Sequence, residues 1–116
     1  MQPEQLKLLA LDALDDMKAV DVNVLDVRGM TSVMDYMIVA SASSARHLKA
    51  LANVVSEQAK SADMPPLGVE GESGGEWALV DLGDVVVHVM LPQVRDFYQL
   101  EKLWSVAASD VADNEG

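Results

Sequence analysis

Apolar residues recur with helical spacing in two segments of the chain. From Glu4 to Val20 they stand three or four positions apart, at Leu6, Leu9, Ala10, Ala13, Met17 and Val20. Charged residues such as Lys7 and Asp12 fall between them, on the other side of a helix. This pattern predicts an amphipathic first helix over 4–20.

A second helical segment follows Ser43 and Ser44, either of which can cap it. Its inward stripe is Leu48, Leu51, Ala52, Val55, Ala59 and Ala62. Pro65 and Pro66 end the segment, because proline cannot continue a helix. A last helix is predicted to start near Arg95, after Pro92, and to end near Trp104.

The remaining segments are short and rich in β-branched residues, which predicts strands. They cover Val22 to Val27, Tyr36 to Ala42, which we expect to be central, and a short stretch from Leu67 to Glu70. The glycine-rich 71–75 is expected to be a flexible connection. Helices mixed with strands predict one α/β domain over 1–108, followed by a frayed acidic tail over 109–116.

The stretch GEWALVDLGDVVVHVM, Gly75 to Met90, is typical of a hairpin that turns at Gly83 and Asp84. That turn places Ala78, Val80, Leu82, Val85, Val87 and Val89 on one side, which should face the core. The other side carries Trp77, Leu79, Asp81, Val86, His88 and Met90. Aromatic and methionine side chains edged by a few polar groups are typical of a protein-binding surface, so we expect this side to be one.

Metal and catalytic interpretations of the same residues are weaker. His88 stands far from His47, the only other histidine, so no metal-ligand spacing is present. Asp81 and Asp84 are three positions apart, which disfavours a two-metal carboxylate pair. Serines such as Ser43 lie at a helix start without a nucleophile elbow, which favours capping. We therefore expect no catalytic residue, no metal and no cofactor.

Charge and composition narrow the class of partner. The chain has 116 residues and a formal net charge of −11, with only eight Lys and Arg. This composition argues against binding a phosphate backbone and favours a basic protein as partner. There is no cysteine, which excludes disulfides and thiolate metal sites. Neither a signal sequence nor a membrane-spanning segment is visible, so we expect a cytoplasmic protein that does not bind membranes.

Four stretches together resemble the ribosomal silencing factor family, also called the iojap or YbeB family. They are LDVRGMTSVMDYMIVASASSARHLKALA, PLGVEG, the hairpin GEWALVDLGDVVVHVM, and RDFYQLEKLW, in this order. The resemblance implies an α/β domain with a mixed sheet and nucleotidyltransferase-like topology. It also implies a translation repressor that binds the large ribosomal subunit through its protein numbered fourteen. Bound there, it would block joining of the small subunit when nutrients are short.

The resemblance also implies roles for individual residues. The motif tryptophan falls on Trp77, the turn aspartate on Asp84 and an aromatic of the motif on Tyr98. The expected partner-binding residues are Trp77, Leu79, Asp81, His88, Met90 and Tyr98. The family's usual Gly-Thr-Ser before the second helix is here Ser-Ala-Ser, at 41–43.

Two alternatives stay open at this point. The first is a nucleotidyltransferase-like enzyme that holds a divalent ion and a nucleotide through Asp81 and Asp84, or through Glu70 and Glu72. The second concerns assembly, because an uncovered apolar face could form a homodimer when ribosomes are absent.

Overall fold

Five strands form one mixed sheet in a computed structural model that describes residues 1–100, apart from the side chain of Glu72. The elements are α1 (Pro3–Asp16), β1 (Val20–Asp26), β2 (Tyr36–Ser41), α2 (Ala45–Ser61), β3 (Gly68–Glu70), the 3-10 turn η1 (Glu72–Gly74), β4 (Trp77–Asp81), β5 (Val85–Met90) and α3 (Pro92–Tyr98). The strand order is β1-β2-β5-β4-β3. β2 and β5 are parallel and the other neighbours antiparallel, which confirms the predicted α/β fold with a mixed sheet.

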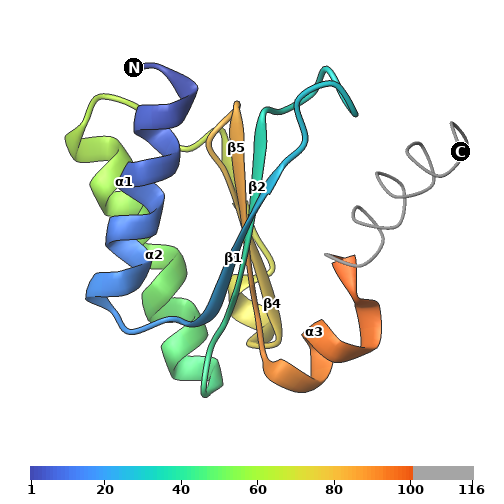
Figure 1. Ribbon diagram of the computed structural model, residues 1–116. Helices are drawn as coiled ribbons and strands as arrows, with labels where there is room; N and C mark the ends of the chain where they lie inside the picture. Colours follow the sequence, from blue (N-terminus) through green and yellow to red (C-terminus); the bar gives the residue numbers. More distant parts are fainter. Residues whose placement is uncertain (101–116) are drawn as a thin grey trace, which may run out of the picture.

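The two faces of the sheet are covered differently (Figure 1). α1 and α2 lie together over one face, called here the helix face, whereas the short α3 lies on the other, called the α3 face. The core on the helix face includes Leu6, Leu14, Ile38, Leu48, Leu51, Val55, Val80, Val85 and Val87. A smaller core on the α3 face consists of Val27, Met37, Val39 and Met90. All six residues of β2 are buried, as expected of an interior strand.

The hairpin has the predicted register. Trp77 pairs with Met90, Leu79 with His88, and Asp81 with Val86. Gly83 has a φ of 92°, a value open to glycine, and its N–H donates to Asp81 Oδ1 at 2.9 Å. The carbonyl of Asp84 accepts from the backbone N–H groups of 35 and 36, at 2.7 and 3.1 Å. The turn is therefore tied to the start of β2.

The first helix ends earlier than predicted, at Asp16 instead of Val20. Lys18 takes a left-handed conformation with φ 59°, and its N–H donates to the carbonyl of Asp15 at 3.0 Å. The N–H of Ala19 reaches the carbonyl of Leu14 at 2.9 Å. This is a Schellman ending, which turns the chain so that Val20 begins β1. The signal was hidden because a lysine occupies the position where glycine is usual.

The glycine-rich segment 71–75, expected to be a flexible connection, has a defined turn conformation. It forms η1, flanked by Gly71 and Gly75 in left-handed conformations. A Cβ atom on Gly71 would lie 2.2 Å from the carbonyl oxygen of Trp77. Backbone packs against backbone here, so this glycine allows a close approach of two chain segments.

The last helix begins at Pro92, not near Arg95, because proline suits the first position of a helix. It ends at Tyr98, and Gln99 follows in a left-handed conformation. The expected continuation to Trp104 and the acidic tail over 109–116 lie outside the described residues.

Replacing Lys18 by glycine should stabilise the domain by about 0.5–1 kcal/mol, because the left-handed conformation strains a side-chain-bearing residue more than glycine. Urea unfolding of Lys18→Gly and of the control Lys18→Ala measures this gain. The alanine variant keeps the strain and should show no comparable gain. Equal free energies of unfolding for the two variants would contradict the account of this helix end.

Candidate functional site

Four aromatic side chains form a row across the α3 face. The Trp77 Nε1–H donates to Nδ1 of His88 at 3.0 Å, and their ring centroids lie 5.9 Å apart. On its other side Trp77 meets Tyr98, with ring centroids 4.8 Å apart. Phe97 contacts Tyr98 edge to face at 5.1 Å. We call His88, Trp77, Tyr98 and Phe97 the aromatic row.

Two elements that are adjacent in space position this row. Trp77 begins β4 and pairs with Met90, the last residue of β5. The chain then turns directly into α3, and the N–H of Leu91 donates to the carbonyl of Glu76 at 3.0 Å. The start of α3 is thus attached to the start of β4, which brings Tyr98 over the indole ring.

Exposure divides the expected partner-binding residues into two groups. Met90 is completely buried in the smaller core and His88 is only 7% exposed, so the expectation that the whole face is exposed is wrong for these two side chains. Met90 clusters with Val27, Met37 and Val39, which come from distant parts of the sequence. Trp77, Leu79 and Asp81 are half-buried, and Tyr98 is 54% exposed. Partner binding by the face stays a prediction.

Phe97 was missed by the sequence interpretation and is the most exposed large apolar side chain of residues 1–100, at 80%. Its neighbour Tyr98 was chosen from the family motif alone. The available signal was an apolar residue on the outer side of a short helix, which helical spacing cannot distinguish from a surface residue of no consequence. An exposed phenylalanine beside a tyrosine and a tryptophan makes an apolar platform at the rim of the α3 face.

Burial lowers the pKa of His88 from 6.5 to about 4. The imidazole is therefore neutral near pH 7. Because Nδ1 accepts from Trp77, the ring proton is assigned to Nε2. A protonated His88 would present a donor to the indole N–H, so the Trp77 orientation depends on the neutral ring.

Two of the carboxylates proposed for the enzyme alternative, Asp81 and Asp84, lie at the hairpin turn. Asp81 accepts from the Gly83 N–H and supports the turn, and Asp84 is exposed within it. Among the described residues, no three His, Asp or Glu side chains are grouped closely enough to hold a metal ion. The acid pair that included Glu72 is not described.

Ser43 and His47 have a structural arrangement. The backbone N–H of Ser43 donates to Nδ1 of His47 at 2.9 Å, and Ser43 Oγ lies 3.1 Å from the same atom. Nε2 lies 2.7 Å from the carbonyl oxygen of Met17, so it carries the proton and donates. Ser44 Oγ accepts from the His47 N–H and is the cap of α2. His47 thus joins the end of α1 to the start of α2.

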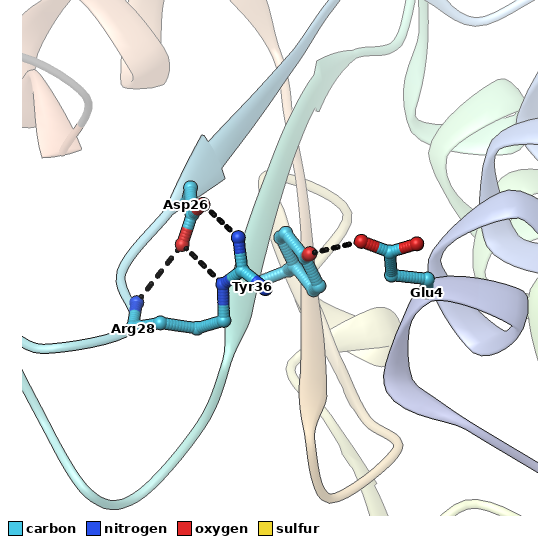
Figure 2. A network of polar contacts seen from close by, with 4 residues as sticks. All are labelled: Glu4, Asp26, Arg28 and Tyr36. Atoms are coloured by element: carbon cyan, nitrogen blue, oxygen red, sulfur yellow. Dashed lines mark hydrogen bonds and ion pairs between the residues drawn. The ribbon is translucent and has the colours of Figure 1, made fainter.

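A second polar cluster lies at the opposite end of the sheet (Figure 2). Arg28 binds Asp26 through two side-chain contacts of 2.6 and 2.9 Å, which lower the pKa of that carboxyl. Tyr36 donates its hydroxyl to Glu4 at 3.4 Å, and burial raises the pKa of this phenol. Lys7 Nζ and the Arg28 guanidinium lie 4.7 and 5.1 Å from the Tyr36 ring centroid. The charges neutralise each other and attach α1 to the sheet, so this cluster is structural.

Fold and site together define a small single-domain α/β protein, with helices over one face of its sheet and an aromatic row on the other. No helix within residues 1–100 is long and apolar enough to cross a membrane. Residues 1–115 match the family model described as "ribosomal silencing factor during starvation". The chain belongs to the ribosomal silencing factor family, as the sequence motifs indicated.

Individual relatives agree with this membership. The ribosomal silencing factor of Chromobacterium violaceum is 50% identical, over 90% of this chain and 85% of its own. A crystal structure of a protein from that organism superposes with a TM-score of 0.89 at 50% identity, covering 90% of this chain and 88% of the other. A mouse protein named "mitochondrial assembly of ribosomal large subunit protein 1" is 34% identical, over 78% of this chain and 41% of its own.

The depressed pKa of His88 makes a prediction about pH. The unfolded chain takes up a proton near pH 6.5, whereas the folded chain does so only near pH 4. Stability should therefore be constant above about pH 6.5 and fall by roughly 3 kcal/mol as the pH is lowered to 4, apart from contributions of other groups. A histidine NMR titration of the folded protein should give a midpoint near pH 4 for His88.

The variant His88→Gln keeps an acceptor for the indole N–H and removes the titration. Its free energy of unfolding should depend less on pH between 6.5 and 4 than that of the unaltered protein. A His88 midpoint near the ordinary 6.5, or unchanged pH dependence in the variant, would show that burial does not hold this ring neutral.

Proposed function

We propose that this protein is a non-catalytic translation repressor that binds the large ribosomal subunit through the α3 face. The single observation that carries the proposal is the aromatic row, whose outer members Phe97 and Tyr98 stay exposed although they adjoin the smaller core. The family is named for ribosomal silencing, and a mouse relative is named for assembly of the large ribosomal subunit. Both support a ribosomal partner.

The finer mechanism follows the family resemblance. The α3 face docks on the large-subunit protein numbered fourteen and sterically blocks the small subunit, in the cytoplasm when nutrients are short. Trp77, Leu79, Asp81 and Tyr98 meet the partner together with Phe97. His88 and Met90 do not contact the partner. His88 holds Trp77 through a hydrogen bond, and Met90 packs beneath the face.

Apolar burial and charge complementarity both favour such a complex. A large aromatic side chain that is exposed in the free protein and desolvated on binding is typical of residues that dominate interface energies. The net charge of −11 speeds encounter with a basic ribosomal partner, while apolar anchors hold the complex. Away from ribosomes the same platform is available to a second copy, so a homodimer is part of the proposal.

Phe97→Ala should weaken binding to purified large subunits by about 2 kcal/mol, roughly thirtyfold. Phe97 is almost fully exposed, so its removal should leave the melting temperature nearly unchanged. Co-sedimentation titrations measure the affinity, and a subunit-joining assay should show recovery in parallel. Trp77→Ala should lose at least as much affinity but also stability, because it removes the contacts with His88 and Tyr98.

The matched control is Leu8→Ala, which removes a 55% exposed apolar side chain from α1 on the other side of the molecule. It should bind as the unaltered protein does. Equal binding by the Phe97 and Leu8 variants would remove the aromatic row from the interface. Failure of the unaltered protein to bind large subunits would remove the ribosomal proposal altogether.

The enzyme alternative predicts a different result. A nucleotide and magnesium that bind only the folded protein would raise its melting temperature by mass action. We expect no shift with ATP and magnesium, either for the unaltered protein or for Asp81→Asn with Asp84→Asn. A shift that the double variant abolishes would favour the enzyme.

A further inference from the structure

The outer edge of β1 has no strand beside it within residues 1–100. β1 lies at the end of the sheet order and pairs only with β2. Alternate backbone N–H and C=O groups of such an edge point away from the sheet and can pair with another extended chain. β1 spans seven residues, which gives it an edge long enough for that purpose.

Three valines of β1 are exposed, between the polar side chains of Asp21, Asn23 and Asp26. Val20, Val22 and Val24 are 44, 36 and 39% exposed. Val24 pairs with Ile38, so it lies on the helix face, yet α1 and α2 pack mainly on β2, β4 and β5. The outer strand thus extends beyond the helices that cover its neighbours. An added strand would bury these valines together with the backbone groups that point away from β2.

A bulge interrupts the edge at its first residues. The register of β1 with β2 shifts between Val20 and Asn23, and Asp21 has a left-handed φ of 49°. Bulges re-aim a strand and interrupt pairing, so an added strand would pair beyond this point, along the regular part of β1 from Asn23 to Asp26. This one places Asp21 beside a cleft.

The cleft has a volume of about 690 Å³ and separates this end of β1 from α3. Its lining includes Asp21, Asn23, Ser41, Arg95, Asp96 and Gln99. The Arg95 guanidinium donates to Ser41 Oγ at 2.8 Å, which holds it against the end of β2. Two carboxylates and one guanidinium line the cleft, so it is suited to a cation that enters from the β1 edge.

We propose that the edge of β1 binds an extended basic segment of a partner protein, which adds as a strand and places a lysine or arginine side chain in the cleft near Asp21 and Asp96. Backbone pairing and the exposed valines supply affinity, and the two carboxylates select a basic segment. This surface is distinct from the aromatic row, and the inference does not rest on the proposed function.

Charge decides between this occupant and a second copy of the chain. Another copy also carries −11 and would bring its own Asp21 to a shared edge. Like charges across paired strands are destabilising, whereas a basic segment gains from the same residue. A nucleic acid offers neither a β-pairing backbone nor a positive charge.

The probe is a short acetylated peptide in which lysine alternates with valine. NMR titration of the full chain should show saturable shifts concentrated in the amides of β1. The same peptide with glutamate in place of lysine should not bind. The double variant Asp21→Asn with Asp96→Asn should weaken binding about tenfold, as expected for the loss of two partly screened charge pairs.

Two controls make the outcome decisive. Asp12→Asn with Asp16→Asn changes the net charge equally, at exposed positions on α1, and should leave affinity for the peptide unchanged. Val24→Lys alters the edge without touching the cleft and should also weaken binding. The proposal is overturned if the lysine peptide fails to saturate, if both double variants respond equally, or if the glutamate peptide binds as well. Sedimentation that shows a dimer abolished by Val24→Lys and undisturbed by the peptide would assign the edge to a second copy instead.

Discussion

The parallel pairing of β2 with β5 at the centre of the sheet determines where the other elements lie. Parallel strands are usually buried on both faces, and these two are. Val85, Val87 and Val89 meet the helices, whereas His88 and Met90 face the other way and are also buried. α1 and α2 supply the cover on one face, whereas within residues 1–100 the smaller core of the α3 face packs against the short α3 and against loop residues such as Met34. The aromatic row lies at the rim of this face, where Phe97 and Tyr98 are exposed.

Much of the fold could be predicted because its signals are local. The Gly83 and Asp84 turn determined the β4–β5 register, and the valines of β5 alternate with a period that a sheet requires. Two features of the fold were not predicted, because the residue that determines each one is not of the usual type or depends on a contact with a distant segment. A lysine ends α1 in a glycine-like conformation, and Gly71 is glycine because a distant carbonyl approaches it.

The candidate site was predictable only in part, for a different reason. Alternation correctly placed Trp77, Leu79, Asp81, His88 and Met90 on one side of the hairpin. Whether that side is open depends on residues far away in sequence, such as Val27 and Met37, which cluster with Met90. Phe97 shows the opposite case, an apolar side chain that is exposed. Its exposure follows from where α3 attaches to the start of β4. Periodicity predicts which side chains share a side of a helix or strand. Whether that side is buried depends on which other segments pack against it.

The separation of β2 from β5 along the chain also has a kinetic meaning. Tyr36 pairs with Val85, nearly half the chain away, whereas the β4–β5 hairpin closes over a two-residue turn. Distant pairings close large loops and form late in folding, while hairpins form early. The surface around Trp77 needs both events, because β5 carries His88 and β2 carries Met37 and Val39, which cluster with Met90. We therefore expect a partly folded chain to have the hairpin before it has the finished surface around Trp77, which forms with the last long-range step of folding.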